Sequence, residues 1–417
     1  MFKAPRGMTD ILPDEQDYWA HIRDTAERLG LRFGYRRIET PVFEEAGLFV
    51  RSVGAGTDIV EKEMYSFADR GGAQMTLQPE GTAPVCRAYL EHGMHNLPQP
   101  VRLYYFASIF RYERPQAGRY RQHHQFGAEA IGDADPAVDA EVVLLAWQLM
   151  RDMGLKGLTL SLNSIGDKAC RPAYLETLRG YYRERLSHLC ADCQARFERN
   201  TLRLLDCKKP TCQTHAEAAP KSHESLCSPC AEHFSKLRSY LDALGWPYAV
   251  SHRLVRGLDY YTRTVFEIQP PEEGGQSTIV GGGRYDGLIE DLGGRPTPAV
   301  GFATGIERIA LNLKRQQAPP PGLPPVQAFV CYMSEAAKVE AVKLTDALRG
   351  AGVTAVLAPG GKSLKGQLRQ AANTGAAYAV ILGEEELRTS SAAVKRVSTG
   401  EQRAVPLGEV AAAVRLA

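Results

Sequence analysis

The chain has 417 residues, 44% of them hydrophobic and 24% charged, so a globular protein of roughly two to four domains is expected. A net charge of +2 neither requires nor excludes a nucleic-acid partner. No apolar run approaches the roughly 20 residues that cross a bilayer, and the N-terminal segment lacks the apolar core of a signal peptide. We therefore expect a cytoplasmic protein with no membrane partner.

Changes of pattern divide the chain into five parts. Residues 171–246 are helical in pattern and rich in Cys, Arg, His and Lys, so they are interpreted as an insertion. The run APPPGLPP at 318–325 is typical of a stiff linker. Strand and helix patterns then alternate from 327 to 382, which indicates a small α/β domain with a parallel core. The expected parts are 1–170, 171–246, 247–317, 318–325 and 326–417.

Two apolar runs predict the centre of a sheet in the first part. Residues 101–110 and 122–131 each have the pattern of a buried strand, and the polar, basic loop between them indicates an antiparallel hairpin. Residues 83–92 have a helical pattern whose start Thr82 would cap. Two further helices are expected at 14–33 and 137–153.

The hairpin loop is rich in arginine. Guanidinium groups match phosphate oxygens bidentately, so the loop favours a phosphate-bearing ligand. Arg111 is expected at the end of the first strand, with Glu113 on the same face two residues later. A solvated basic hairpin is the alternative interpretation. The four arginines are Arg111, Arg114, Arg119 and Arg121.

The segment LVRGLDYYTRTVFE at 254–267 combines a cation, a carboxylate and two phenols, and it runs into a strand-like stretch. Arg256, Asp259 and the pair Tyr260–Tyr261 suit a small substrate that is both anionic and a hydrogen-bonding heterocycle. An ordinary strand entered through a polar turn would have a similar sequence.

Two further segments have the chemistry of a binding site. GFATGIERIAL at 301–311 begins a helix from whose first turns Arg308 would project, although the spacing is not that of a P-loop. QPEGTA at 78–83 offers a carboxylate and a hydroxyl that could bind an ammonium group. Helix packing and simple helix capping are the respective alternatives.

Six of the nine cysteines lie between 190 and 230. The pairs Cys190/Cys193 and Cys227/Cys230 have zinc-knuckle spacing, and Cys207 and Cys212 offer further ligands. A reduced helical insertion with small buried thiols is the alternative, so the metal content stays open. The scattered Cys86, Cys170 and Cys331 are expected to be buried apolar side chains.

Together these segments resemble the histidyl-tRNA synthetase family of class II aminoacyl-tRNA synthetases, along essentially the whole chain. Three segments resemble the class motifs, the first of which lies in the dimer interface of the family: GYRRIETPVFE at 34–44, FRYE with RQHHQFGAE, and GFATGIERIAL. Two resemble signatures particular to the histidine enzyme: LVRGLDYYTRTVFE and GGGRYDGL at 281–288.

The resemblance implies an α+β fold, with an antiparallel catalytic sheet of six to seven strands flanked by helices, a helical insertion, and a C-terminal α/β anticodon-binding domain. It implies a homodimer that uses ATP and Mg²⁺ to join L-histidine to histidine tRNA. The reaction passes through a histidyl-adenylate and releases AMP and diphosphate. The resemblance requires no metal in the cysteine-rich insertion, and no segment reads as an editing domain.

The resemblance also assigns roles by motif position. For ATP, Arg111 would contact the α-phosphate, Arg308 the γ-phosphate and Glu113 the adenine side. Arg256 would lie between the histidine carboxylate and the α-phosphate. The catalytic residues would thus be Arg111, Arg256 and Arg308.

The remaining assignments concern histidine and tRNA. The α-amino group would be held by Glu80, Thr82 and Gln125. The imidazole would be held by Glu129 and Tyr261, with Tyr260 beside them. The tRNA acceptor end would be contacted by Arg114, Gln116 and Arg119.

Two positions depart from the family pattern. Gln78 stands where arginine is usual, and Ala117 replaces a commonly basic loop residue. Other interpretations are a non-catalytic regulatory subunit of histidine biosynthesis, which typically lacks the anticodon-binding domain, and a pure RNA-binding module. His123 and His124 are interpreted as hairpin residues rather than catalysts.

Overall fold

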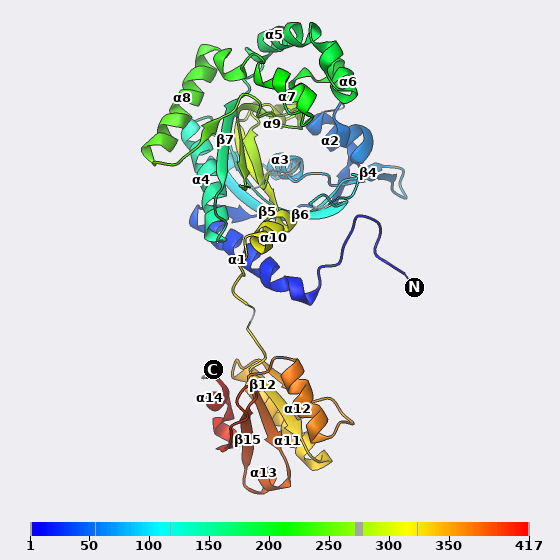
Figure 1. The fold of residues 1–417 in the computed structure, drawn as a ribbon, viewed down its shortest axis with the longest axis vertical. Helices are drawn as coiled ribbons and strands as arrows, with labels where there is room; N and C mark the ends of the chain where they lie inside the picture. The colour runs from blue at the N-terminus through cyan, green and yellow to red at the C-terminus, as the bar shows by residue number, and fades with distance from the viewer. Residues whose placement is uncertain (1, 55, 117, 272–277, 323, 416–417) are drawn as a thin grey trace. The chain divides into compact units, whose positions relative to one another are not determined.

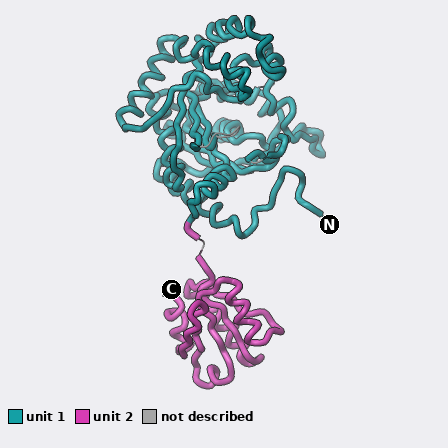
Figure 2. The backbone as a smooth tube through the Cα atoms, in the orientation of Figure 1, with its two compact units in different colours: residues 1–320 teal, residues 321–417 magenta. Residues whose placement is uncertain are grey.

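The computed structural model describes residues 2–54, 56–116, 118–271, 278–322 and 324–415. The chain forms two compact units, Met1–Pro320 and Pro321–Ala417 (Figure 2). The boundary between them falls within the Pro-rich run 318–325. The finer five-part division remains a proposal. Among the described residues, no helix has the length and apolar character that crossing a bilayer requires.

An eight-stranded sheet organises the first unit (Figure 1), in the order β1-β5-β6-β11-β10-β9-β7-β8. Neighbouring strands are antiparallel except for the two edge pairs, β1–β5 and β7–β8. The antiparallel-rich sheet confirms the expected fold class, but the expected six to seven strands are too few. The strands are β1 Arg36–Arg37, β5 Val101–Phe110, β6 Gln122–Ile131, β7 Thr159–Ser164, β8 Ala249–Val250, β9 Thr262–Gln269, β10 Val280–Arg284 and β11 Ala299–Gly305.

Helices cover both faces of this sheet. On β5, Tyr104 packs into one apolar cluster, whereas its neighbours Leu103 and Tyr105 pack into another. Because helices cover both faces of the sheet, β5 is apolar at nearly every position. This is why the sequence predicted a buried strand at 101–110. The first cluster contains residues of α1 Gln16–Arg32, α4 Pro136–Asp152, α8 Ser228–Ala243 and α10 Ile306–Arg315; the second contains residues of α3 Thr82–Glu91, α5 Arg171–Arg183 and α9 Leu288–Asp291.

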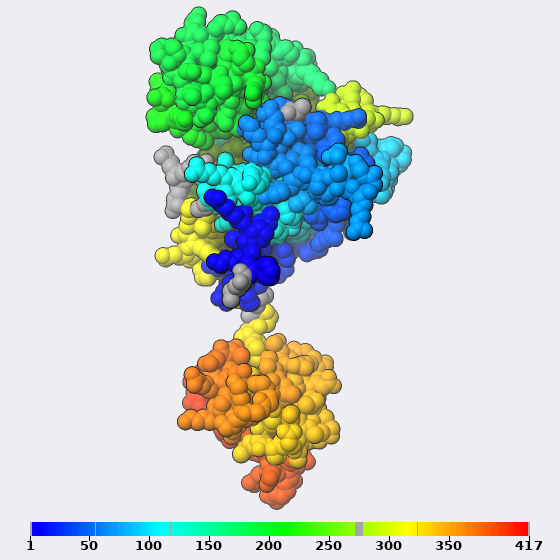
Figure 3. All heavy atoms as spheres, turned by 90° about the vertical axis from the view of Figure 1, so that its right-hand side faces the viewer, coloured from blue at the N-terminus to red at the C-terminus, as the bar shows by residue number. Residues whose placement is uncertain are grey.

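The region 171–246 is helical, as expected, and its side chains gather at one end of the first unit (Figure 3, green). Its last helix, α8, packs on α4, where His233 Nε2 lies 3.1 Å from Asp139 Oδ1. This region also contains α6 Ala191–Arg199, α7 Pro210–Glu217 and the short helices η4 Leu186–His188, η5 Thr201–Leu204 and η6 Ser222–Glu224.

Several smaller elements complete the first unit. A three-stranded antiparallel sheet has the order β2-β4-β3. These elements are β2 Phe43–Glu45, β3 Ser66–Ala68, β4 Gln74–Leu77, α2 Ala46–Val53, and the short turns η1 Pro13–Glu15, η2 Ile59–Glu63 and η3 Met94–Asn96.

The second unit has its own core around a five-stranded sheet of order β13-β12-β14-β15-β16. The first three are parallel, as expected, and the last two are antiparallel additions that the alternating pattern did not reveal. Its elements are β12 Ala328–Tyr332, α11 Glu335–Gly350, β13 Ala355–Leu357, α12 Leu364–Asn373, β14 Tyr378–Leu382, α13 Glu384–Arg388, β15 Ser391–Arg396, β16 Gln402–Pro406, η7 Leu407–Glu409 and α14 Val410–Arg415.

A buried ion pair fastens α4 to the sheet. Arg284 on β10 and Asp139 on α4 have no solvent-exposed side-chain surface, and the guanidinium forms an ion pair with the carboxylate. Burial alone would raise the pKa of Asp139, but the charge of Arg284 and a hydrogen bond from His233 outweigh burial and lower that pKa to about 2. The depressed pKa means that the charged form is stabilised by folding.

We expect Arg284→Leu to lower the free energy of unfolding of the first unit by roughly 3–5 kcal/mol at pH 7, because it leaves the Asp139 carboxylate buried without its partner. Urea unfolding followed by tryptophan fluorescence reports on this unit, since Trp19, Trp147 and Trp246 all lie in it. The contribution of Asp139 is full above its unfolded pKa near 4 and falls as the pH drops toward 2. The exposed Arg295→Leu should change stability by less than about 0.5 kcal/mol; equal effects of the two variants would contradict the assignment.

Candidate active site

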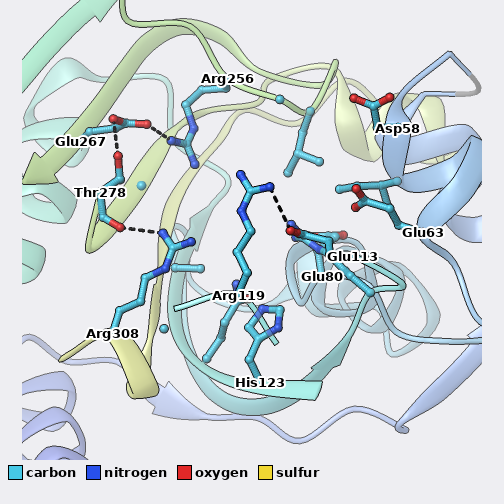
Figure 4. A pocket seen from close by; sticks show the side chains of 18 of the residues that line it. Asp58, Glu63, Glu80, Glu113, Arg119, His123, Arg256, Glu267, Thr278 and Arg308 are labelled. Atoms are coloured by element: carbon cyan, nitrogen blue, oxygen red, sulfur yellow. Dashed lines mark hydrogen bonds and ion pairs between the residues drawn. The ribbon is translucent and has the colours of Figure 1, made fainter. Parts of the chain in front are cut away.

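A cavity of about 470 Å³ lies against one face of the eight-stranded sheet, where residues of β6, β9, β10 and β11 line it. Figure 4 shows Arg119, Arg256 and Arg308 directed into one space, with Glu63, Glu80 and Glu113 across from them. The residues singled out from the sequence that line this cavity are Glu80, Thr82, Arg111, Glu113, Arg119, Gln125, Arg256, Tyr260, Tyr261 and Arg308.

The Arg256 guanidinium packs against the backbone of β10 at Gly281. A Cβ at Gly281 would stand 2.3 Å from Arg256 Nη2, so only glycine leaves room for the guanidinium there. Glu267, the partner of Gly281 across β9 and β10, accepts a hydrogen bond from Arg256 Nη1 at 2.5 Å. Burial would lower the pKa of Arg256, but Tyr261 and Glu267 raise it, so the group stays a fixed cation. Sequence reasoning found Arg256 but missed Glu267, although it lies in the same quoted segment.

The opposite end of the cavity carries an excess of positive charge. Arg308 Nη1 donates to the Thr278 carbonyl at 2.7 Å, and burial together with neighbouring Arg119 lowers the Arg308 pKa. Arg111 Nε donates to the Pro79 carbonyl at 2.7 Å. Burial, followed by the charges of Arg111 and Arg308, lowers the pKa of His123 to about 3, so this imidazole is neutral at physiological pH. Such convergent cations favour a polyanionic ligand.

Glu80 lies two residues before the first residue of helix α3. Its carboxylate accepts hydrogen bonds from the backbone N–H groups of Thr82 at 2.8 Å and Ala83 at 2.7 Å. The expectation that Thr82 caps this helix was wrong: Thr82 is the first helical residue, and its hydroxyl donates to Glu129 Oε1 at 2.8 Å instead. The Tyr260 hydroxyl also donates to Glu80, at 3.4 Å. Burial raises the pKa of Glu80, so a cationic ligand group nearby would be favourable.

Glu129 is fully buried on β6, beneath the lining residues Thr82 and Tyr105. Its Oε1 accepts from the hydroxyls of both, and its Oε2 accepts from the Tyr285 hydroxyl. Burial raises the pKa of Glu129 to about 8, against the opposing effect of these hydrogen bonds. A Cβ at facing Gly301 would lie 1.6 Å from Oε2, so glycine is required there too. Tyr105 and Tyr285 were missed, although Tyr285 lies in the quoted run GGGRYDGL.

The loop of the basic hairpin is only partly at the cavity. Strand β5 ends at Phe110, so Glu113 is not on the strand face where it was expected, and it pairs with Arg119 at 3.2 Å. Arg114 and Gln116 are exposed and are not among the described lining residues. Ala117 lies outside the described residues.

Two other residues singled out from the sequence lie away from the cavity lining. Gln78 is buried, and its Nε2 donates to the Ser108 carbonyl at 2.9 Å, beside the end of β5. Asp259 accepts a hydrogen bond from Asn200 at 3.3 Å, and burial raises its pKa. Both therefore support neighbouring segments rather than line the cavity.

The insertion contributes a basic wall that sequence reasoning did not find. Arg196, Arg203 and Lys208 line the cavity together with the residues of the sheet. They are far from the motifs in sequence, and they lie on α6, on η5 and in the loop before α7, so no local pattern marks them.

The cysteines gather in two sets, a grouping that the sequence left open. Cys190 and Cys193 lie beside Cys207 and Cys212, not beside the second knuckle. Cys227 and Cys230 lie beside Asp167 and Cys170; Cys170 is buried, as expected, but it belongs to a cluster. Cys86 and Cys331 are buried, as expected.

The chain matches known proteins along nearly its whole length. Residues 7–309 match the family model of histidyl-tRNA synthetase, and residues 327–416 match that of an anticodon binding domain. A histidine–tRNA ligase of Dehalococcoides mccartyi is 57% identical over 410 residues, covering 98% of each chain. One of Moorella thermoacetica is 50% identical over 406 residues, covering 97% of this chain and 96% of the relative.

Solved structures agree with these matches. The crystal structure of apo S. aureus histidyl-tRNA synthetase is 37% identical, covers 100% of both chains and has a TM-score of 0.83. A Bacillus halodurans structure described as an ATP phosphoribosyltransferase regulatory subunit/histidyl-tRNA synthetase covers 89% of this chain and 96% of its own, with a TM-score of 0.66. At 24% identity that second likeness concerns the fold alone. The family match and the close relatives together show that this chain belongs to the histidyl-tRNA synthetase family.

Proposed function

We propose that the protein joins L-histidine to histidine tRNA in an ATP-dependent reaction that passes through histidyl-adenylate and releases AMP and diphosphate. The observation that carries this proposal is the convergence of Arg111, Arg256 and Arg308, from three distant segments, on one cavity. A chain of this family that has kept the pocket is expected to catalyse rather than only regulate.

The first step requires two anions to meet. The histidine carboxylate attacks the α-phosphorus in line, and positive charge must stand where the two approach. We assign this charge to Arg256 and Arg111, and we assign the γ-phosphate to Arg308 and the adenine side to Glu113. The fixed position of Arg256 against Gly281 and Glu267 supports its role, because a preorganised cation does not reorganise during the reaction.

Mg²⁺ would neutralise the distal phosphates. Glu63 lines the cavity and offers the carboxylate oxygens that Mg²⁺ prefers, so it would hold the ion. Burial, and then the charge of Glu113, raises the pKa of Glu63. A bound cation would lower this pKa, because it stabilises the carboxylate form.

Histidine would be bound at the other end of the cavity. We assign its α-amino group to Glu80, Thr82 and Gln125, which all line the cavity. Glu129 and Tyr261 would pair with the imidazole, with Tyr260 beside them. An ionised carboxylate accepts about four hydrogen bonds, and Glu129 has three, so one more N–H can be accepted. An apolar analogue would leave these groups unpaired, which excludes it by roughly 10⁴-fold.

The second step needs no side-chain nucleophile, because the terminal ribose hydroxyl of the tRNA attacks the adenylate. The exposed Arg114 and Gln116, and Arg119 at the cavity, are assigned to the acceptor end. The second unit would bind the anticodon through stacking and base-edge contacts. We place this activity in the cytoplasm.

A homodimer is proposed from the first class motif. Phe43 and Phe67 lie on the small sheet with exposures of 51% and 43%, and their rings are 6.1 Å apart. Paired exposed aromatics favour an interface. Sedimentation equilibrium should therefore give twice the 45.8 kDa chain mass, and a shift to monomer in the double variant Phe43→Ser/Phe67→Ser. A wild-type monomer at micromolar concentration would contradict the dimer.

We expect Arg256→Ala to lower the rate of histidine-dependent exchange of pyrophosphate into ATP by about a hundredfold or more, corresponding to ~3 kcal/mol of lost transition-state stabilisation. Binding of tRNA should change by less than about twofold, because the charge lies deep in the cavity. The nearby Arg253, which pairs with Glu217 outside the lining, provides the control variant Arg253→Ala. Exchange that survives Arg256→Ala within a few-fold would refute the role; no exchange by folded wild type would favour the regulatory subunit.

Histidine binding should release a proton from Glu129 at pH 7. The pKa of about 8 leaves this carboxyl largely protonated in the empty pocket, whereas accepting an imidazole N–H requires the carboxylate. Affinity should therefore rise from pH 7 to about 8 and then level off. Titration calorimetry of histidine binding in two buffers of different ionisation enthalpy gives the number of protons released. The isosteric Glu129→Gln should remove this linkage; an unchanged proton count in that variant would exclude Glu129 as the group.

A further inference from the structure

We propose that the insertion carries a structural zinc ion bound by Cys190, Cys193, Cys207 and Cys212. The four Sγ atoms all lie within 4.8 Å of one another, and Cys190 Sγ is 3.9 Å from Cys207 Sγ. A tetrahedral zinc with bonds of about 2.3 Å to sulfur places its ligands about 3.8 Å apart. The side chains are therefore already close to the arrangement that zinc requires.

The positions of the ligands along the chain also fit. Cys190 and Cys193 have C-x₂-C spacing at the start of α6, and Cys207 and Cys212 have C-x₄-C spacing around the start of α7. Both spacings are in the range of structural zinc sites. The two helices have nine and eight residues, too short to be stable alone, so a shared ion would fix one against the other.

A backbone N–H group supports one of the thiolates. The N–H of Cys190 donates to Cys212 Sγ at 3.2 Å. Such contacts orient metal ligands and spread their negative charge. Three of the four thiols are buried, which shields the site from solvent. Four protein ligands leave no open position, so the site is structural and not catalytic.

A disulfide does not explain the same cluster. A disulfide holds two sulfurs at about 2.05 Å, whereas all cysteines here are free and four of them converge on one point. A single disulfide would use only two of the four converging thiols.

A second zinc site is carried by separate residues. Asp167 and Cys170 lie between β7 and α5, where the chain enters the insertion, and Cys227 and Cys230 lie at the start of α8. One oxygen of Asp167 and the three sulfurs lie within 4.8 Å of one another. Arg263, 3.3 Å from Asp167, offsets part of the negative charge of the set. This ion would join the entry of the insertion to its last helix.

The first site has a consequence for the cavity. Arg196 and Arg203 lie between Cys193 and Cys207 in sequence, and Lys208 follows directly. All three line the cavity. An ion that fixes this segment therefore fixes the basic wall that the insertion adds to the active site.

The zinc content of the full chain tests both sites. Reduced protein is saturated with ZnCl₂, dialysed and analysed by mass spectrometry of the metal. We expect two zinc ions per chain, and one in each double variant, Cys190→Ser/Cys193→Ser and Cys227→Ser/Cys230→Ser. The control Cys331→Ala removes a buried cysteine from the second unit and should retain two. Zinc below one per chain in folded wild type would overturn the proposal, as would a content that neither double variant lowers.

Alkylation of the cysteines of the wild-type protein tests the two zinc sites without relying on variants that could fail to fold. The ligand cysteines should resist iodoacetamide until a chelator is added, and hydrogen exchange over 190–217 should then accelerate while 328–414 is unchanged. Thiols that become reactive only after a reductant would show disulfides and overturn the proposal. Protection of one set alone would keep that site and remove the other.

Discussion

Two ionisable side chains pack at and beneath the floor of this cavity only because the strands next to them carry glycine. Gly281 leaves room for the Arg256 guanidinium, and Gly301 leaves room for the Glu129 carboxyl group; a single Cβ at either position would overlap the side chain that faces it. Antiparallel register brings these glycines to adjacent strands, β10 and β11, opposite Glu267 and Glu129. The register of the sheet therefore sets the positions of the site's charges.

The same register separates the site into two chemical ends. Arginines gather where the hairpin loop meets α10, and hydroxyls with buried carboxyls gather where β6 meets α3. Arg256 lies beside Tyr261, with its guanidinium carbon 5.5 Å from the ring centre, and so links the two. An amino acid and a triphosphate need this division, since one brings an ammonium group and an imidazole and the other brings only negative charge.

Much of this could be predicted from the sequence, and the failures have physical causes. Residues 101–110 and 122–131 were predicted to the residue because a strand covered on both faces is apolar throughout. The edge strands β1 and β8 have two residues each, too few to show a pattern. Thr82 does not cap α3, because its hydroxyl donates to Glu129 instead, and the Glu80 carboxylate accepts from the first backbone N–H groups of the helix. The cysteine spacing indicated metal, but only the tertiary fold shows which cysteines meet.

The central claim is that Arg256 stands between the substrate carboxylate and the α-phosphate. A crystal structure with histidine and a non-hydrolysable ATP analogue tests it most directly. The account predicts that the Arg256 guanidinium, still resting on Gly281, donates to both ligands, with Arg111 on the same phosphate. Ligands bound with Arg256 still paired to Glu267 alone, or turned away from the phosphate, would contradict it.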